Sequence, residues 1–292
     1  MPVLSIHPTE AAHLNDSLAS VEVNEDALHE PSYQATVLNS VRDAAGSKFD
    51  EIVEQAAKRL AERPWFIVVR GLPPERATSI LVAISATLGE LVEPYRQPWS
   101  RVVRHIVPDR DRAVGGRVLN EFLHTDGTDW AQPNDYTCLF CVRPDQSDDG
   151  ESRLLDVSAL LDEATEAPDR ELISRLATEP LPWRIADELG GGVHWQPAVD
   201  LADPSIRWLR YTVDLSLVEG VASLAKQTQD DLYAFERLVE GCRGVRRTKL
   251  QAGDLLLIDN GRSLHARTKI SDPAGSEREL LRTKVTRKGG SQ

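Results

Sequence analysis

The segment Asn120-Glu-Phe-Leu-His124-Thr-Asp126-Gly127 places an imidazole and a carboxylate two residues apart. We expect this segment to end a strand that runs from Val118 to Asp126. Side chains two positions apart on a strand project to the same face of the sheet. One histidine and one carboxylate on a common face are two of the three ligands of a 2-His-1-carboxylate site, which binds Fe(II) and leaves coordination positions open. The motif therefore predicts a metal centre that needs one more ligand.

The third ligand has to come from another histidine of the chain. His265 follows the run Gly253-Asp-Leu-Leu-Leu-Ile-Asp-Asn260, which predicts a turn, a buried strand and a second turn. That position would deliver its imidazole at the edge of a strand. His194 follows Gly190-Gly-Gly192, a sequence typical of a flexible loop, and is the alternative third ligand.

Two arginines in Arg278-Glu-Leu-Leu-Arg282 fall on one face of another predicted strand, about 13 Å apart at roughly 3.3 Å per residue. An arginine that points into a protein interior needs an anion, so inward-facing arginines would bind anionic small molecules. An edge strand with both arginines in solvent is the alternative interpretation.

Other residues near the metal motif are candidates for the pocket. Phe122 and Asn120 lie two and four residues before His124, so on a strand they would share its face. They are therefore the predicted pocket residues, whereas Arg101 and Arg104 are expected in solvent.

The rest of the chain predicts a mainly β fold with helical insertions. Short β-type runs separated by turns, with few helices and no βαβ alternation, favour a sandwich or jelly roll. We expect residues 1–43 to form a polar N-terminal arm and residues 44–292 to form one domain. The expected strands are 65–69, 118–126, 135–142, 152–156, 208–213, 244–250, 254–259 and 279–286, and the expected helical stretches are 47–61, 80–88, 157–178 and 224–239.

Composition excludes several classes of protein. The 292 residues include 34 basic and 46 acidic ones, for a net charge of −12. This balance argues against binding to nucleic acid or to an anionic membrane surface. No signal peptide or membrane span is visible, so we expect a cytoplasmic protein. Cys138 and Cys141 form a C-x-x-C on a predicted strand, where they would face opposite sides as buried thiols, not as a redox or zinc site.

Taken together, these segments resemble the taurine dioxygenase and clavaminate synthase superfamily of Fe(II)/2-oxoglutarate oxygenases. The resemblance extends from about Trp65 to Arg282, and its most specific parts are the His-Thr-Asp-Gly segment, the Gly-Asp-Leu-Leu-Leu-Ile-Asp-Asn strand and the R-x-x-x-R motif. It implies a double-stranded β-helix (jelly-roll) core, with iron held by His124, Asp126 and His265.

The resemblance also implies roles for residues that bind the cosubstrate and the substrate. Arg278 occupies the place of the arginine that binds the distal carboxylate of 2-oxoglutarate, and Arg282 that of an arginine that meets an anionic group of the substrate. Ser152 would help to hold 2-oxoglutarate, although its segment Asp149-Gly-Glu-Ser152 departs from the Gly-Gly-Asp-Thr-like pattern at the first and last positions.

The function implied is a 2-oxoglutarate- and O₂-dependent dioxygenase that hydroxylates an unactivated C–H bond of a small amino acid or a derivative in a biosynthetic pathway. A taurine-type sulfonate dioxygenase and a 2-oxoglutarate-dependent desaturase or cyclase are the alternatives. Halogenation is disfavoured, because Asp126 fills the position that chloride would need on the iron. A jelly-roll binding protein with a vestigial metal site and a zinc hydrolase that uses the same three ligands are further alternatives.

Overall fold

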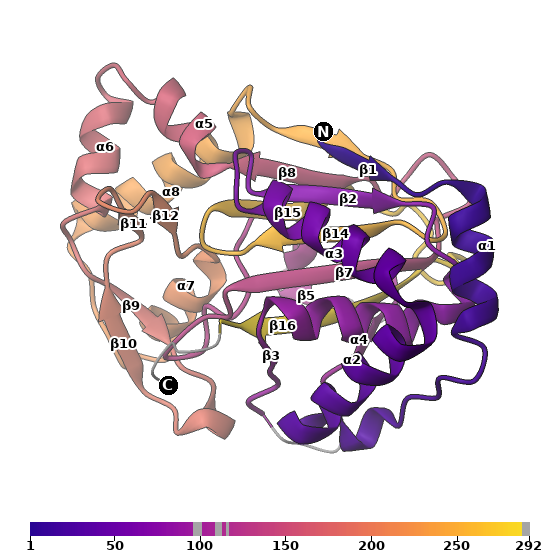
Figure 1. Ribbon diagram of the computed structural model, residues 1–292. Coiled ribbons are helices and arrows are strands. Elements are labelled where there is room, and N and C mark those ends of the chain that lie inside the picture. The colour runs from indigo at the N-terminus through magenta and orange to yellow at the C-terminus, as the bar shows by residue number, and fades with distance from the viewer. Residues whose placement is uncertain (96–100, 109–112, 115–116, 288–292) are drawn as a thin grey trace.

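The computed structural model describes residues 1–95, 101–108, 113–114 and 117–287 (Figure 1). Its largest sheet has the strand order β1-β2-β14-β7-β16-β3, and β4 also pairs with β16. A smaller sheet has the order β13-β8-β15. All pairings in these two sheets are antiparallel except that of β1 with β2. The mainly sheet fold with helices that the sequence predicts is thus confirmed.

The bounds of the elements are as follows. The strands are β1 (Val3–Ser5), β2 (Phe66–Arg70), β3 (Glu90–Leu91), β4 (Arg104–Ile106), β5 (Ala113–Val114), β6 (Arg117–Val118), β7 (Tyr136–Arg143), β8 (Ser152–Asp156), β9 (Leu181–Arg184), β10 (Val193–Gln196), β11 (Val199–Asp200), β12 (Ser205–Ile206), β13 (Arg246–Thr248), β14 (Leu255–Asp259), β15 (Ser263–Arg267) and β16 (Glu279–Thr286). The helices are α1 (Pro8–Ser17), α2 (Pro31–Ala45), α3 (Ser47–Leu60), α4 (Ala77–Leu88), α5 (Val157–Glu163), α6 (Asp169–Leu176), α7 (Arg210–Val218) and α8 (Lys226–Gly241), with 3₁₀ turns η1 (Glu25–His29), η2 (Pro74–Arg76), η4 (Leu119–Glu121) and η5 (Asp187–Leu189).

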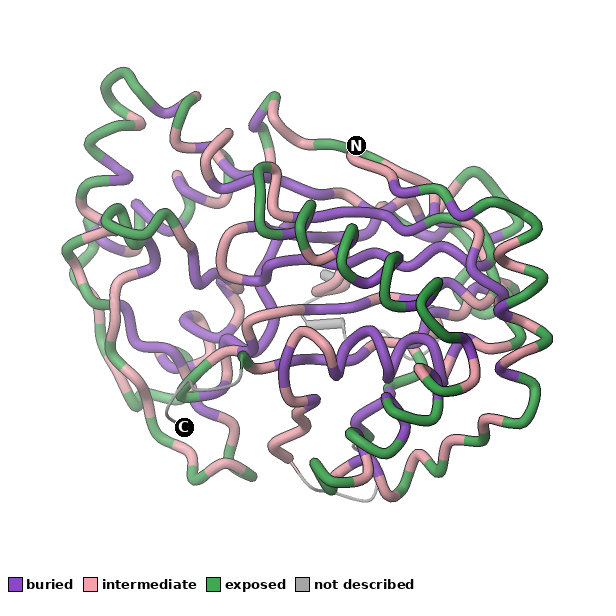
Figure 2. Tube along the Cα trace, in the orientation of Figure 1, coloured by how far each residue is buried: buried purple, intermediate pink, exposed green. Residues whose placement is uncertain are grey.

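Both faces of the large sheet are buried, which explains why its central strands read as continuous apolar runs. On β14, Leu255 and Leu257 pack in a cluster with the helices α2, α3 and α4, which cover one face in Figure 1. Leu256 and Ile258 point the other way, into a cluster that also contains Leu154 of β8 in the small sheet. The purple strands in Figure 2 show this burial along the sheet.

The two cysteines of the C-x-x-C lie on opposite faces of β7, as predicted. Cys138 belongs to the cluster under the helices and Cys141 to the cluster between the sheets. Burial raises the pKa of Cys138 to about 11 and that of Cys141 to about 12, so both remain protonated thiols. Both are free and buried.

The first 43 residues carry regular structure that their sequence did not suggest. β1 pairs in parallel with β2, and the predicted boundary at residue 44 falls inside α2. Apolar side chains of this segment belong to the same buried cluster as the helix-covered face of the large sheet; they include Leu4, Leu14, Leu18, Leu28, Val37 and Val41.

One buried polar residue of α2 reaches the edge strand β3. The Gln34 side-chain amide donates to the carbonyl oxygens of Leu28 and Leu91, each at 2.8 Å, and its oxygen accepts from the Leu91 backbone N–H at 2.9 Å. Gln34 is therefore fully engaged although it is only 3% exposed.

Two segments that were predicted as strands have a different structure. Residues 208–213, predicted as a strand, mostly form the start of α7, where Arg210 pairs with Asp214 one turn later and with Glu236 of α8. Residues 118–126, also predicted as a strand, contain η4 instead, and only an isolated bridge from His124 to β15 follows it. None of the helices in the described part of the chain has the length and apolar character of a membrane span.

Candidate active site

His124, Asp126 and His265 come together as predicted. Each offers a ligand atom, and the three atoms lie within 4.8 Å of one another. His124 follows η4, and its backbone N–H and carbonyl both pair with those of His265 on β15. This single antiparallel bridge brings the two rings to a centroid separation of 4.5 Å. All three residues are buried.

Both histidines are suited to bind a metal as neutral ligands. Burial lowers the pKa of both rings, and for His265 the nearby His124 adds to the effect, so that its pKa falls to about 3. The Nδ1 of His124 donates to the carbonyl of Phe122 at 2.7 Å, which leaves its Nε2 lone pair free for a ligand bond. The Nε2 of His265 faces Asp126 Oδ2 at 3.6 Å.

Asp126 is held in its charged form by its neighbours. Burial alone would raise its pKa, but Arg282 and Lys284 hold it well below the usual value. Arg282 Nη1 and Lys284 Nζ approach the same oxygen, Oδ1, at 3.2 and 3.4 Å. Thr137 donates its hydroxyl to the other oxygen at 2.8 Å. The carboxylate is thus ionised and fixed in orientation.

The loop that carries Asp126 is fixed by the side chain of Asn260, which lies in the connection between β14 and β15. Asn260 accepts from the Asp126 backbone N–H at 2.7 Å and donates to the Asp126 and Asn134 carbonyl oxygens at 3.0 and 2.8 Å. Two neutral imidazoles and one fixed carboxylate are the donor set of a divalent transition-metal site with open positions. The residues therefore fit iron.

A cavity of about 990 Å³ adjoins this triad, although His265 is not among its lining residues. His124 and Asp126 line it, together with Asn120 on η4 and Arg282 on β16, as predicted from the sequence. Phe122, also predicted as a pocket residue, is not among the lining residues, because η4 interrupts the expected strand and its alternation. Arg101, and Arg104 of β4, are exposed, as expected, and both also line the cavity.

Comparison with known proteins identifies the family. The family described as "Taurine catabolism dioxygenase TauD, TfdA family" matches residues 39–284, which is most of the chain. The chain belongs to the TauD, TfdA family. The resemblance and the dioxygenase class predicted from the sequence are therefore confirmed. A search of curated proteins found no match.

Solved structures of similar fold include two amino-acid oxygenases. One is an asparagine oxygenase in complex with Fe(II), 2S,3S-3-hydroxyasparagine and succinate (TM-score 0.75, 13% identity, covering 98% of this chain and 93% of that one). The other is the non-heme iron oxygenase OrfP, seen with Fe and alpha-ketoglutaric acid (TM-score 0.68, 21% identity, 98% and 94% coverage). A single-residue mutant of OrfP was solved with (3S)-hydroxy-L-Arg (TM-score 0.71, 19% identity, 98% and 94% coverage). At these identities the likeness concerns the fold.

The residues predicted to bind 2-oxoglutarate in this TauD, TfdA family member lie deep in the fold. Arg278 is 6% exposed and precedes β16, where a register shift between Glu279 and Leu280 interrupts the ladder. It lies against Gly150, since a β-carbon on that glycine would sit 3.3 Å from Arg278 Cδ. Ser152, two residues after Gly150, is buried at the start of β8. Their roles toward 2-oxoglutarate remain predictions.

The alternative third ligand, His194, is placed elsewhere. It lies on β10, paired with Trp183 of β9, and its Nε2 is 2.7 Å from the Gln196 side-chain oxygen. In the described part of the chain it does not belong to the group of potential metal ligands.

Sequence reasoning missed Lys284, Thr137 and Asn260, all of which bind Asp126. Lys284 could have been found, because residues two apart on the predicted strand 279–286 share a face, and Arg282 was already assigned to that face. Thr137 and Asn260 are polar residues beside apolar runs, and nothing in the sequence marks their partner.

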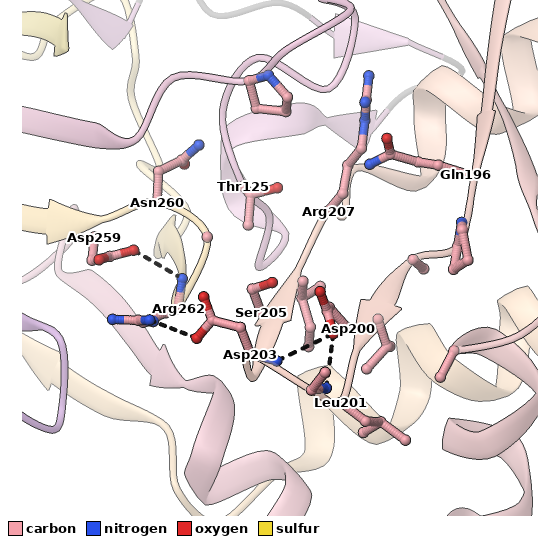
Figure 3. Close-up of a pocket in the computed structure, with 18 of the residues that line it drawn as sticks. Thr125, Gln196, Asp200, Leu201, Asp203, Ser205, Arg207, Asp259, Asn260 and Arg262 are labelled. Carbon is pink, nitrogen blue, oxygen red and sulfur yellow. Dashed lines mark hydrogen bonds and ion pairs between the residues drawn. The ribbon is translucent and has the colours of Figure 1, made fainter. Parts of the chain in front are cut away.

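A second cavity, of about 790 Å³, is shown in Figure 3, and among its lining residues only Thr125 also lines the first cavity. Its charged groups pair mainly with one another: Arg262 binds Asp203 at 2.6 Å and Arg287 binds Asp259 at 2.8 Å. This cavity contains none of the three potential metal ligands, so we place the active site in the first cavity.

Proposed function

We propose that the chain is an Fe(II)- and 2-oxoglutarate-dependent dioxygenase that hydroxylates a C–H bond of a small amino acid or amino-acid derivative. The observation that carries this function is the buried set His124, Asp126 and His265, of which His124 and Asp126 line a cavity of about 990 Å³. Membership of the TauD, TfdA family supports the reaction class.

The finer fold assignment supports the same function. We assign the large sheet and the β13-β8-β15 sheet, with the apolar cluster that contains Leu154, Leu256 and Ile258 between them, to a jelly-roll core. β15 is an edge strand of the smaller sheet, whereas Asp126 binds Thr137 of β7 and Arg282 of β16 in the larger one. We therefore assign the cavity to the mouth of the roll.

Each residue of the site has a part in the reaction. When bound, iron and 2-oxoglutarate together activate O₂, while the cosubstrate loses CO₂ and becomes succinate. His124, Asp126 and His265 would hold the iron through three positions and leave the others open. Arg278 would bind the distal carboxylate of 2-oxoglutarate, and Ser152 would help to hold the cosubstrate.

Arg282 would orient the substrate through an acidic group. A guanidinium forms paired hydrogen bonds to a carboxylate or a sulfonate, and so it restricts which C–H bond faces the metal. The structurally similar oxygenases were solved with hydroxylated asparagine and hydroxylated arginine, which supports an amino acid over a taurine-like sulfonate.

The test has two steps. Anaerobic addition of Fe(II) and then 2-oxoglutarate should produce the metal-to-ligand charge-transfer colour of a chelated 2-oxo acid. Incubation with an amino-acid library under ¹⁸O₂ should then give a product that contains one labelled oxygen, together with succinate. A product that lacks two hydrogens would indicate desaturation or ring closure, and turnover with sulfonates alone would overturn the amino-acid assignment.

A further inference from the structure

We propose that the substrate of this site carries two acidic groups, and that Lys284 selects it by binding the second one while Arg282 binds the first. The proposal rests on the proposed function and specifies its substrate class: an amino acid with an acidic side chain, such as a carboxylate or sulfonate, in place of a neutral amide.

Lys284 is a buried cation at the wall of the active-site cavity. It lies two residues after Arg282 on β16, and both side chains project from the same face of the strand to Asp126. Its ammonium group lies 4.4 Å from the centre of the Trp130 ring, a cation–π contact that keeps it in place. The side chain is only 10% exposed. A lysine in such a position is costly unless an anion compensates its charge.

The available negative charge is too small for the cations at this end of the cavity. Among the described residues, Asp126 is the only carboxylate that forms an ion pair with either Arg282 or Lys284, and both approach the same oxygen. A divalent metal bound to Asp126 would draw on the same charge. Two buried cations then need anions from the bound molecule.

A third cation strengthens the imbalance. Arg104 of β4 lies directly opposite Arg282 in the sheet, lines the cavity and is exposed to it. In the described part of the chain, no carboxylate pairs with it within 4.0 Å. The nearby Asp129, which also lines the cavity, accepts a hydrogen bond from the Tyr95 hydroxyl and keeps its negative charge. The cations Arg104, Arg282 and Lys284 thus line the cavity with Asp129 and Asp126, and Asp126 is also a potential metal ligand.

The other cations around the cavity are already neutralised. Arg184 binds both Asp187 and Glu219 at 2.5 Å. Arg101 pairs with Glu25 at 3.6 Å and with Asp26 at 3.5 Å. The surplus positive charge is therefore confined to the wall formed by β16 and β4, next to the triad.

The geometry suits two acidic groups of one small molecule. Because Arg282 and Lys284 contact the same oxygen of Asp126, their cationic groups lie close together. One carboxylate could bind to Arg282, with a second one, a few bonds away, at Lys284. A neutral side-chain amide would leave the ammonium with only the Asp126 oxygen that it shares with Arg282, and this is a basis for discrimination.

The test compares isosteric ligands. Protein loaded with Zn(II), which does not support turnover, and with 2-oxoglutarate is titrated calorimetrically with L-aspartate against L-asparagine and with L-glutamate against L-glutamine. Intrinsic tryptophan fluorescence, to which Trp130 contributes, provides a second readout. In at least one of the two pairs, the wild type should bind the acid with a dissociation constant lower than that of the amide by on the order of tenfold.

The variants assign this preference to Lys284. Lys284→Met should abolish it by weakening the acid and leaving the amide within about twofold, while Lys284→Arg should retain it. Lys226→Met is the control, because Lys226 is exposed and pairs with Asp230 on the surface of α8. Thermal unfolding verifies that each variant is folded. If Lys284→Met does not fold, the wild type and Lys284→Arg still test the preference, because both should bind the acid more tightly than the amide.

Several results would overturn the inference. Equal affinity for acid and amide in the wild type would do so while the proposed function stands. An equal loss for both ligands in Lys284→Met would show that Lys284 and Arg282 share one carboxylate. A loss confined to 2-oxoglutarate would place Lys284 against the cosubstrate. If no amino acid bound and no 2-oxoglutarate-dependent hydroxylation occurred, the proposed function itself would fail, and this inference with it.

Discussion

His124 and His265 bind each other through their backbones: the His124 N–H donates to the His265 carbonyl at 3.0 Å, and the His265 N–H donates to the His124 carbonyl at 2.9 Å. These are the pair of bonds that two directly opposed residues exchange in an antiparallel ladder. The separation of the two imidazoles is therefore set by main-chain hydrogen bonds. The arrangement of these two potential metal ligands does not depend on a regular strand around His124.

Loss of any one of the three potential ligands should abolish metal binding and 2-oxoglutarate turnover. We expect His124→Ala, Asp126→Ala and His265→Ala to purify without stoichiometric iron and to release no succinate, since two ligands do not hold the metal. Iron content and succinate release measure this. His194→Ala is the control and should keep native iron content. Wild-type activity in any triad variant, or loss of iron in His194→Ala, would contradict the ligand assignment.

Arg278→Ala should weaken 2-oxoglutarate binding and leave metal binding intact. Removing one partner of a buried charge pair costs about 2–5 kcal/mol, which corresponds to a rise in KM of roughly thirtyfold or more. Steady-state kinetics with varied 2-oxoglutarate measure the change. Arg247→Ala, which alters an exposed arginine of β13, should behave as wild type. A defect in Arg282→Ala in place of Arg278→Ala would exchange the two roles.

The metal-free protein should lose stability as the pH falls from about 6.5 toward 3. Burial lowers the pKa of His265 to about 3, so the folded protein keeps this ring neutral while the unfolded chain takes up a proton near its ordinary pKa of 6.5. The stabilisation is complete above pH 6.5 and declines by up to about 1.4 kcal/mol per pH unit below it. Urea unfolding in EDTA at a series of pH values gives the free energy of unfolding as a function of pH. This free energy should decrease less steeply with falling pH in His265→Gln than in the wild type, and an identical pH dependence would refute the prediction.

Gly253→Ala should destabilise the fold strongly. Gly253 has φ = +83°, and a β-carbon there would lie 2.0 Å from the Leu72 carbonyl oxygen, in the turn that leads into β14. We expect a decrease in the free energy of unfolding of about 3 kcal/mol. Gly241→Ala is the matched control, because a β-carbon at that end of α8 meets nothing within 4 Å. Equal unfolding midpoints for the two variants would contradict this expectation.

The pattern of apolar residues in the sequence predicted the bounds of several strands and helices of the fold. The predicted strands 152–156 and 279–286 coincide with β8 and β16, and the predicted helix 47–61 differs from α3 by one residue. In each case both the periodicity and the adjacent turn residues favour the same structure, so local preference and tertiary packing agree.

Local preference failed where tertiary contacts decide the structure. Residues 208–213 are rich in residues with a high propensity for strands, yet Arg210 gains ion pairs with Asp214 and Glu236 only as part of a helix. The first 43 residues look polar because α1 and α2 bury narrow apolar stripes. The three potential metal ligands could be predicted from residue type, whereas Asn260 and Thr137 could not, since their function is defined by contact with Asp126.

Gln34 has a consequence for how this protein behaves among copies of itself. A strand at the border of a sheet presents free peptide groups to which a neighbouring molecule can add. At β3 the outward N–H and C=O of Leu91 are both bound by the Gln34 amide, which imitates a further strand with a single side chain. Because Gln34 occupies both of these peptide groups, neither of them is available to pair with a strand of another molecule.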